Sequence, residues 1–214
     1  MTPWGSELSV PRRRIGRADA MLGLLTPTDP AWVEAVEGDL DRLLSDHAHC
    51  ELKAAQSALS LVARYGGAAP EIVPPLLGLA HEETEHFEQV HGRVVQRGAA
   101  LDLPDSDGYV VALRRAVRAD HGAHPPMLDR LLINALIEGR SCERFRLLSE
   151  RLGDADLRAF YRSLMESEAR HHRLFTRLAE ARFGHQATHA RLATLAAREA
   201  EVADRLPLGP RVHG

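Results

Sequence analysis

Apolar residues recur at steps of three and four over most of the chain, and this spacing places them along one face of a helix. Each run is bounded by residues that start or stop helices, such as a capping Asp or a terminating Gly. The pattern therefore predicts an all-α protein with four long helices. They are expected between Asp29 and Gly66, Pro70 and Gly98, Pro126 and Gly153, and Asp154 and Gly184.

The connections between these helices differ in length. Short turns join the first helix to the second and the third to the fourth, whereas the long connection over 99–126 contains a short predicted helix capped by Ser106. Two antiparallel helical hairpins joined by a long crossover define a ferritin-like four-helix bundle. We expect an N-terminal tail or strap over 1–28, the bundle over 29–184, and a peripheral helix (187–205) with a tail over 185–214.

The composition of the chain indicates where in the cell the protein is located and whether its cysteines are reduced. Hydrophobic residues make up 44% of the 214 residues, as is ordinary for a globular protein. No apolar run reaches the ~20 residues that a transmembrane helix needs, and no apolar signal segment follows the N-terminal arginines. We therefore expect no membrane contact and a cytoplasmic location, with Cys50 and Cys142 as reduced core cysteines.

Acidic residues interrupt the apolar face of every predicted bundle helix, although a buried carboxylate is costly unless it is paired or bound to a metal. In the second and fourth helices a His follows the Glu three residues later, on the same side of the helix one turn along. Di-iron carboxylate bundles use this pattern, with one Glu from each of two helices and Glu-x-x-His from each of the others. The six candidate ligands are Glu51, Glu83, His86, Glu138, Glu168 and His171.

Position on the helix separates these residues from others with the same spacing. Glu88 and His91 also form a Glu-x-x-His pair, but Glu88 lies five residues from Glu83, about 140° around the helix and off its apolar face. We therefore expect Glu88 and His91, and likewise Glu82 and Glu85, to face solvent.

The two helical hairpins supply a second criterion, because residues that face each other should be equidistant from the turn. The midpoint between the two Glu candidates is Gly67 in the first hairpin and Gly153 in the second, and each midpoint lies inside a predicted turn. Glu143, the alternative to Glu138 on the third helix, pairs less symmetrically, although it follows a Cys as Glu51 does. We prefer Glu138 and keep Glu143 as an alternative.

The donor atoms of the six candidates indicate which metal is expected. Oxygen and nitrogen ligands without a thiolate suit iron or manganese better than structural zinc. His47 lies one helical turn before Glu51, and it is either part of the site or an ordinary core histidine.

Three blocks of sequence carry most of these candidates, namely 46–55 (DHAHCELKAA), 138–145 (EGRSCERF) and 167–175 (SEARHHRLF). They resemble the tRNA 2-methylthio-isopentenyl-adenosine hydroxylases of the MiaE type, and the resemblance covers about residues 20–184. It implies a non-haem di-iron centre that uses dioxygen and external reducing equivalents to hydroxylate the isopentenyl side chain of a modified adenosine in tRNA. It also implies that the six candidates are the ligands of two iron ions.

The same resemblance implies a tRNA partner, an electron-donor protein or reductase, and a monomer or small oligomer. Phosphate contacts would come from cationic side chains. The candidates are Arg114, Arg115 and Arg118 in the crossover and Arg140 and Arg144 on the third helix. The net charge of −3 does not favour RNA binding, so ordinary solvated arginines are the alternative.

Three other functions are compatible with the same bundle. One is an iron oxidase or storage protein of the ferritin or rubrerythrin kind, although the chain lacks the paired Cys-x-x-Cys motifs of a rubredoxin module. Another is a di-iron oxygenase that acts on a small molecule. The third is a metal-free helical interaction module in which the buried charges neutralise one another.

Overall fold

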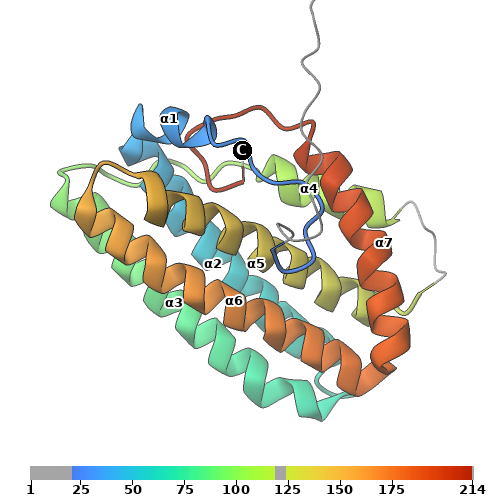
Figure 1. The fold of residues 1–214 in the computed structure, drawn as a ribbon. Coiled ribbons are helices and arrows are strands. Elements are labelled where there is room, and N and C mark those ends of the chain that lie inside the picture. Colours follow the sequence, from blue (N-terminus) through green and yellow to red (C-terminus); the bar gives the residue numbers. More distant parts are fainter. Residues whose placement is uncertain (1–20, 119–123, 214) are drawn as a thin grey trace, which may run out of the picture.

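The computed structural model of the protein describes residues 21–118 and 124–213, so most of the predicted N-terminal tail (1–28) lies outside the described residues. Within those two ranges all regular secondary structure is helical and there is no strand (Figure 1). The elements are α1 (Trp32–Glu37), α2 (Leu40–Tyr65), the 3₁₀ helix η1 (Pro70–Ile72), α3 (Val73–Gln96), α4 (Gly108–Arg118), α5 (Pro126–Arg151), α6 (Ala155–Phe183) and α7 (His185–Ala203).

The predicted ferritin-like bundle is confirmed. Helix α2 packs along α3 and α5 along α6, and α4 lies in the long connection between the two hairpins (Figure 1). Helix α7 packs against α4, α5 and α6 at one side of the bundle. None of the helices in the described part of the chain combines the length and the apolar composition needed to cross a lipid bilayer.

The predicted start of the first bundle helix at Asp29 is wrong. The chain instead forms the short helix α1 and then breaks at Gly38-Asp39 before α2 begins at Leu40. The Asp39 side chain accepts a hydrogen bond of 3.0 Å from the Arg42 backbone N–H, which caps the new helix. Trp32 is fully buried, so α1 packs as a separate element across the bundle.

Most of the other predicted boundaries agree with the structure. Gly98 and Gly184 have φ values of 73° and 83°, which glycine adopts without strain, and they follow the ends of α3 and α6. Asp154 caps α6 as predicted, with its carboxylate 2.8 Å from the Asp156 backbone N. The predicted cap of α4 is wrong by one residue, because Asp107 rather than Ser106 accepts from the Val110 N–H, at 2.9 Å.

The hydrophobic core is divided into two clusters along the bundle. In each of the four long helices, one end of the apolar face belongs to the first cluster and the other end to the second. On α2, for example, Leu44 lies in one cluster and Leu61 in the other, with Glu51 between them. The acidic residues on the other three helices occupy the same intermediate level. A polar layer therefore crosses the middle of an otherwise apolar core.

The first interhelical turn gives a test of the packing. A Cβ atom on Gly66 would lie 2.6 Å from the Val62 carbonyl oxygen and 2.9 Å from Val73 Cγ2, whereas one on Gly67 would meet nothing within 4 Å. We expect Gly66→Ala to lower the free energy of unfolding by about 1–3 kcal/mol because the turn must shift. The matched control Gly67→Ala should change it by less than about 0.5 kcal/mol. Urea unfolding of both variants measures this, and equal effects would contradict the packing described.

Candidate metal centre

All six predicted ligands meet in the polar layer. Glu51 comes from α2, Glu138 from α5, and the two Glu-x-x-His pairs from α3 and α6. Each side chain is buried because its Glu or His falls on the helix face that packs against the other three helices. Their exposed fractions are 4% for Glu51, 0% for Glu83, 5% for His86, 5% for Glu138, 2% for Glu168 and 2% for His171.

The six residues form two overlapping sets of four, and within each set the potential ligand atoms lie within 4.8 Å of one another. Glu83 and Glu168 belong to both sets, while Glu51 and Glu138 each belong to one. His86 completes the set that contains Glu51, and His171 completes the other. Each set would offer a cation one Glu and one His of its own, together with the two carboxylates that both sets share.

The protein alone does not satisfy the polar atoms of this layer. Glu83 Oε1 and both ring nitrogens of His171 are buried without a well-oriented hydrogen bond among the described residues, although His171 Nδ1 lies 3.0 Å from Glu83 Oε1 and Nε2 lies 3.2 Å from Glu82 Oε2. Buried polar atoms without partners are rare in proteins and mark places where an ion or water belongs. Four carboxylates also balance the charge of two divalent cations. The residues present therefore fit a pair of metal ions.

The crowding of carboxylates shifts the acid–base behaviour of the layer. Burial, together with the charges of Glu168 and Glu83, raises the pKa of Glu138 well above its ordinary value. Burial would also raise the pKa of Glu51, but hydrogen bonds from His47 and His86 outweigh it and lower that pKa to about 2. Despite burial, the carboxylates beside His86 raise the pKa of its imidazole to about 10.

Two further residues hold Glu51 in place. His47 Nε2 lies 2.6 Å from Glu51 Oε1, and the Tyr161 hydroxyl lies 3.3 Å from His47 Nδ1. His47 is fully buried, so the structure places it beside the site rather than in a separate part of the core. Sequence reasoning missed Tyr161, although its position seven residues before Glu168 puts it two turns away on the same helix face.

The predicted solvent exposure of the remaining acidic residues on α3 holds in part. Glu85 and Glu88 are exposed, but His91 is half-buried and its ring stacks on Phe87. Glu82 is only about one-third exposed, and its Oε2 lies 3.2 Å from His171 Nε2. A carboxylate at the outer nitrogen of a ligand histidine fixes the orientation of the ring. Glu82 is therefore part of the site, contrary to the sequence prediction.

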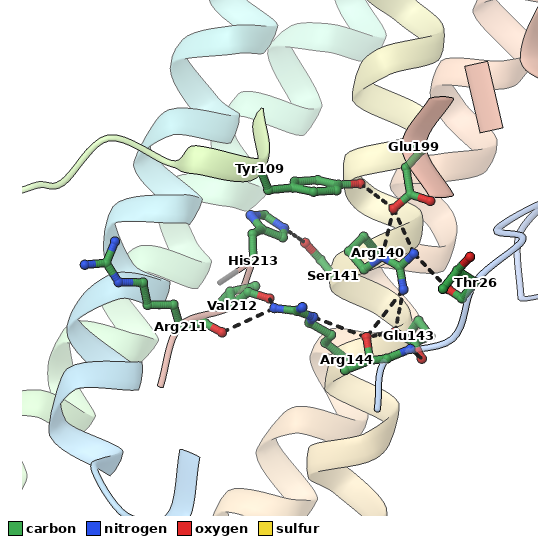
Figure 2. Close-up of polar contacts among 11 residues, drawn as sticks. Thr26, Tyr109, Arg140, Ser141, Glu143, Arg144, Glu199, Arg211, Val212 and His213 are labelled. Atoms are coloured by element: carbon green, nitrogen blue, oxygen red, sulfur yellow. Dashed lines mark hydrogen bonds and ion pairs between the residues drawn. The ribbon is translucent and has the colours of Figure 1, made fainter. Parts of the chain in front are cut away.

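Glu143, the alternative to Glu138, lies in a different cluster (Figure 2). Its carboxylate accepts hydrogen bonds from the backbone N–H of Thr28 at 2.9 Å and from the Thr28 hydroxyl at 2.6 Å. Arg140 Nη1 donates to it at 3.1 Å. Because Glu138 and Glu143 are five residues apart on α5, they point to different sides of the helix.

The prediction that Arg140 and Arg144 contact RNA is wrong. Their exposed fractions are 1% and 5%, and both take part in internal contacts (Figure 2). Arg140 donates to Glu199 Oε1 on α7 at 2.8 and 2.9 Å, and Arg144 donates to the Val212 carbonyl at 2.6 Å. Neither guanidinium can reach a nucleic acid on the surface without breaking these contacts.

The arginines of α4 lie differently. Arg114, Arg115 and Arg118 are exposed, and neither Arg114 nor Arg118 forms an ion pair with a carboxylate among the described residues. Burial of part of the side chain and the nearby charges of Arg130 and Arg118 lower the pKa of Arg114. Exposed cations that crowd together attract an anionic ligand.

A cavity of about 860 Å³ connects these cations with the polar layer. It lies between α2, α4 and α5, and Glu138 is part of its wall. Arg114 and Arg118 line it together with apolar residues such as Ile133 and Ile137. Its volume is that of a typical small-molecule site.

The fold and the site together define the class of the protein. A four-helix bundle with one Glu on each of two helices and Glu-x-x-His on each of the other two is the architecture of the non-haem di-iron carboxylate proteins. A solved structure supports this: a Synechococcus protein described as having aldehyde deformylating oxygenase activity superposes with a TM-score of 0.81. It is 39% identical and covers 89% of this chain and 95% of its own.

Within that class, the chain belongs to the MiaE family, whose model, described as tRNA-(ms2io6A)-hydroxylase, matches residues 18–214. Two relatives are each named tRNA 2-(methylsulfanyl)-N6-isopentenyladenosine(37) hydroxylase. The Pseudomonas putida protein is 42% identical over 183 residues, with 85% of each chain covered. The Salmonella typhimurium protein is 31% identical over 204 residues, covering 72% of this chain and 74% of its own. The resemblance seen in the sequence blocks is thus confirmed.

The pKa shifts predict how metal binding depends on pH. Metal ions bind deprotonated ligands, so cations must displace the protons held by His86, whose pKa is about 10, and by Glu138, whose pKa is raised. We expect the apparent affinity for Fe²⁺ to rise between about pH 6 and pH 8, about tenfold per pH unit for each proton released. Anaerobic competition with a chelator measures it, and an affinity independent of pH would contradict this view of the layer.

Proposed function

We propose that the protein is a di-iron monooxygenase that hydroxylates the isopentenyl side chain of 2-methylthio-isopentenyl-adenosine in tRNA. The observation that carries the proposal is the meeting of six buried Glu and His side chains, one of which, Glu138, lines a cavity that Arg114 and Arg118 also line. Membership in a family of tRNA hydroxylases supports the same substrate. A tRNA-modifying enzyme also accords with a cytoplasmic location.

In this proposal the two overlapping sets, Glu51, Glu83, His86 and Glu168 and then Glu83, Glu138, Glu168 and His171, would hold the two iron ions. The iron pair supplies the activation of dioxygen, which the side chains of amino acids cannot perform on an unactivated C–H bond. The overall reaction consumes one dioxygen, two electrons and two protons, and it yields the alcohol and one water. The electrons come from an external donor protein or reductase.

The side chains around the metals have tasks of their own. The hydrogen bond between His47 and Glu51 and the contact of Glu82 with His171 each hold one predicted ligand in a fixed orientation. The apolar walls of the cavity receive the prenyl group and exclude water from the site. Arg114 and Arg118 at the same cavity bind phosphates of the RNA backbone.

A di-iron oxygenase acting on a small molecule is the second candidate. It is favoured by the Synechococcus relative, which is described by an aldehyde deformylating oxygenase activity and is 39% identical to this chain. The cavity, whose lining combines apolar residues with polar ones, would accommodate an aldehyde as well as a nucleoside. Iron storage requires a large cage, and size-exclusion chromatography separates a cage from a monomer or small oligomer.

The ligand assignment can be tested by metal analysis. Glu83→Ala and Glu168→Ala should each reduce iron from about two ions to fewer than one per chain after anaerobic loading, because both carboxylates would touch both metals. Glu88→Ala, an exposed change on the same helix as Glu83, is the matched control and should keep the iron. A variant of Glu83 or Glu168 that retains two irons would refute the assignment.

The pair Glu138→Ala and Glu143→Ala separates the two alternatives on α5. Glu138→Ala should lose iron without a large loss of stability, since it removes a crowded carboxylate. Glu143→Ala should keep the iron and lower stability by about 3–5 kcal/mol, because Arg140 is left with a buried charge that has lost a partner. Iron content and urea unfolding of each variant measure the two effects. The opposite pattern would favour Glu143 as the ligand.

The substrate is tested in cells with and without the protein. We expect tRNA from cells that contain it to carry the hydroxylated nucleoside and tRNA from deleted cells to carry only the unhydroxylated precursor. The Glu168→Ala variant should behave like the deletion. Mass spectrometry of nucleosides from digested tRNA measures the ratio. An unchanged ratio would reject the tRNA substrate, and aldehyde consumption by the iron-loaded protein would then favour the small-molecule oxygenase.

A further inference from the structure

The segment that follows α7 has no helix of its own, yet it is firmly attached to the bundle. Val212 and His213 are 1% and 5% exposed. The Val212 N–H donates to Asp46 at 2.8 Å, and its carbonyl accepts from Arg144 at 2.6 Å. The Trp32 indole N–H donates to the carbonyl of Gly209 at 3.0 Å. Contacts with α1, α2 and α5 therefore fix a stretch of chain that has no regular structure.

His213 is the residue that these contacts position (Figure 2). Its Nδ1 lies 2.8 Å from Asp107 Oδ2 and its Nε2 lies 3.1 Å from the Ser141 hydroxyl oxygen. Its ring stacks on Tyr109 with the centroids 5.0 Å apart. Both nitrogens are thus engaged and the plane of the ring is set. For this reason we do not regard the grouping of Cys50, Asp107 and His213 as a metal site, although their ligand atoms lie within 4.8 Å of one another.

The position of His213 relates it to the metal centre. It lines the same cavity as Glu138. Its partner Ser141 follows Glu138 by three residues on α5, on the same side of the helix one turn along. The fixed imidazole is therefore part of the wall of the chamber that leads to the predicted ligand Glu138.

The two buried arginines that were predicted to bind RNA explain how this wall is maintained. Arg144 holds the Val212 carbonyl and lies over the Trp32 ring, 4.8 Å from its centroid. Arg140 binds Glu199 of α7, and Glu199 also accepts from the hydroxyl of Tyr109, the residue on which His213 stacks. The network thus ties α7, α4 and the following segment to one face of α5.

We propose that His213 is a positioning residue for the substrate, whose ring contacts the base of an adenosine that bears an apolar substituent on its exocyclic nitrogen. This inference rests on the proposed function. Because both ring nitrogens are engaged by protein groups and one ring face packs on Tyr109, the imidazole offers a bound base the part of its ring that lines the cavity, and not a hydrogen bond. Aromatic surfaces of this kind are how proteins hold bases that have left the stack. Arg140 and Arg144 act indirectly, because they hold in place the segment after α7 that carries His213.

The test uses the full-length, iron-loaded protein and two anticodon stem–loops, one with the modified adenosine and one with unmodified adenosine. His213→Ala should weaken binding of the modified stem–loop about tenfold and leave the unmodified one nearly unchanged, because phosphate contacts do not depend on the ring. His213→Phe keeps an aromatic ring and should recover most of the affinity. The matched control is His189→Ala, since His189 is exposed on α7 and is not part of the cavity wall. Iron content should remain at about two per chain in every variant.

Three outcomes would overturn the inference. One is equal affinity of His213→Ala and the unaltered protein for the modified stem–loop. Another is an equal loss for both stem–loops, which indicates a general structural effect. The third is loss of iron from His213→Ala, which would assign the residue to the metal centre. If the unaltered protein itself fails to prefer the modified stem–loop, the proposed tRNA function fails instead, and the binding data distinguish the two failures.

Discussion

The burial of four carboxylates at one level of a helical bundle is the constraint on which the rest of this structure depends. Each long helix places apolar side chains above and below that level, so two hydrophobic clusters hold the carboxylates in place from both ends. Desolvation and mutual repulsion raise the pKa values of Glu83 and Glu138, and the layer is not satisfied by its own hydrogen bonds. Cations would convert this unfavourable arrangement into a stable one.

The sequence was sufficient to predict the bundle and the grouping of the six residues because both depend on local periodicity. Helical spacing places Glu83 and His86 on one face, and the symmetry of each hairpin about its turn places facing residues at one depth. Residues with a similar local pattern but a different angular position, such as Glu88 and Glu143, lie outside the cluster in the structure. The assignment of the six residues as iron ligands stays a prediction.

The sequence predictions failed for residues whose contacts are with partners far away in the chain. Arg140 is separated by 59 residues from Glu199, the carboxylate that it binds, and no local sequence pattern predicts that pair. Arg144 likewise contacts Val212, 68 residues away. An arginine on a helix can cover the surface or fill a buried polar site, and only the fold decides between them. The break before α2 was missed because the apolar pattern continues through Gly38-Asp39.

The alignment of both hairpins about Gly67 and Gly153 limits how the length of this protein can vary. One residue inserted into a bundle helix between its turn and its carboxylate would rotate that carboxylate by about 100° and displace it by about 1.5 Å along the axis. If one residue were then deleted further along the same helix, the residues between the insertion and the deletion would still point in the wrong direction. The segments between turn and layer must therefore keep their length, a constraint that does not apply to the crossover.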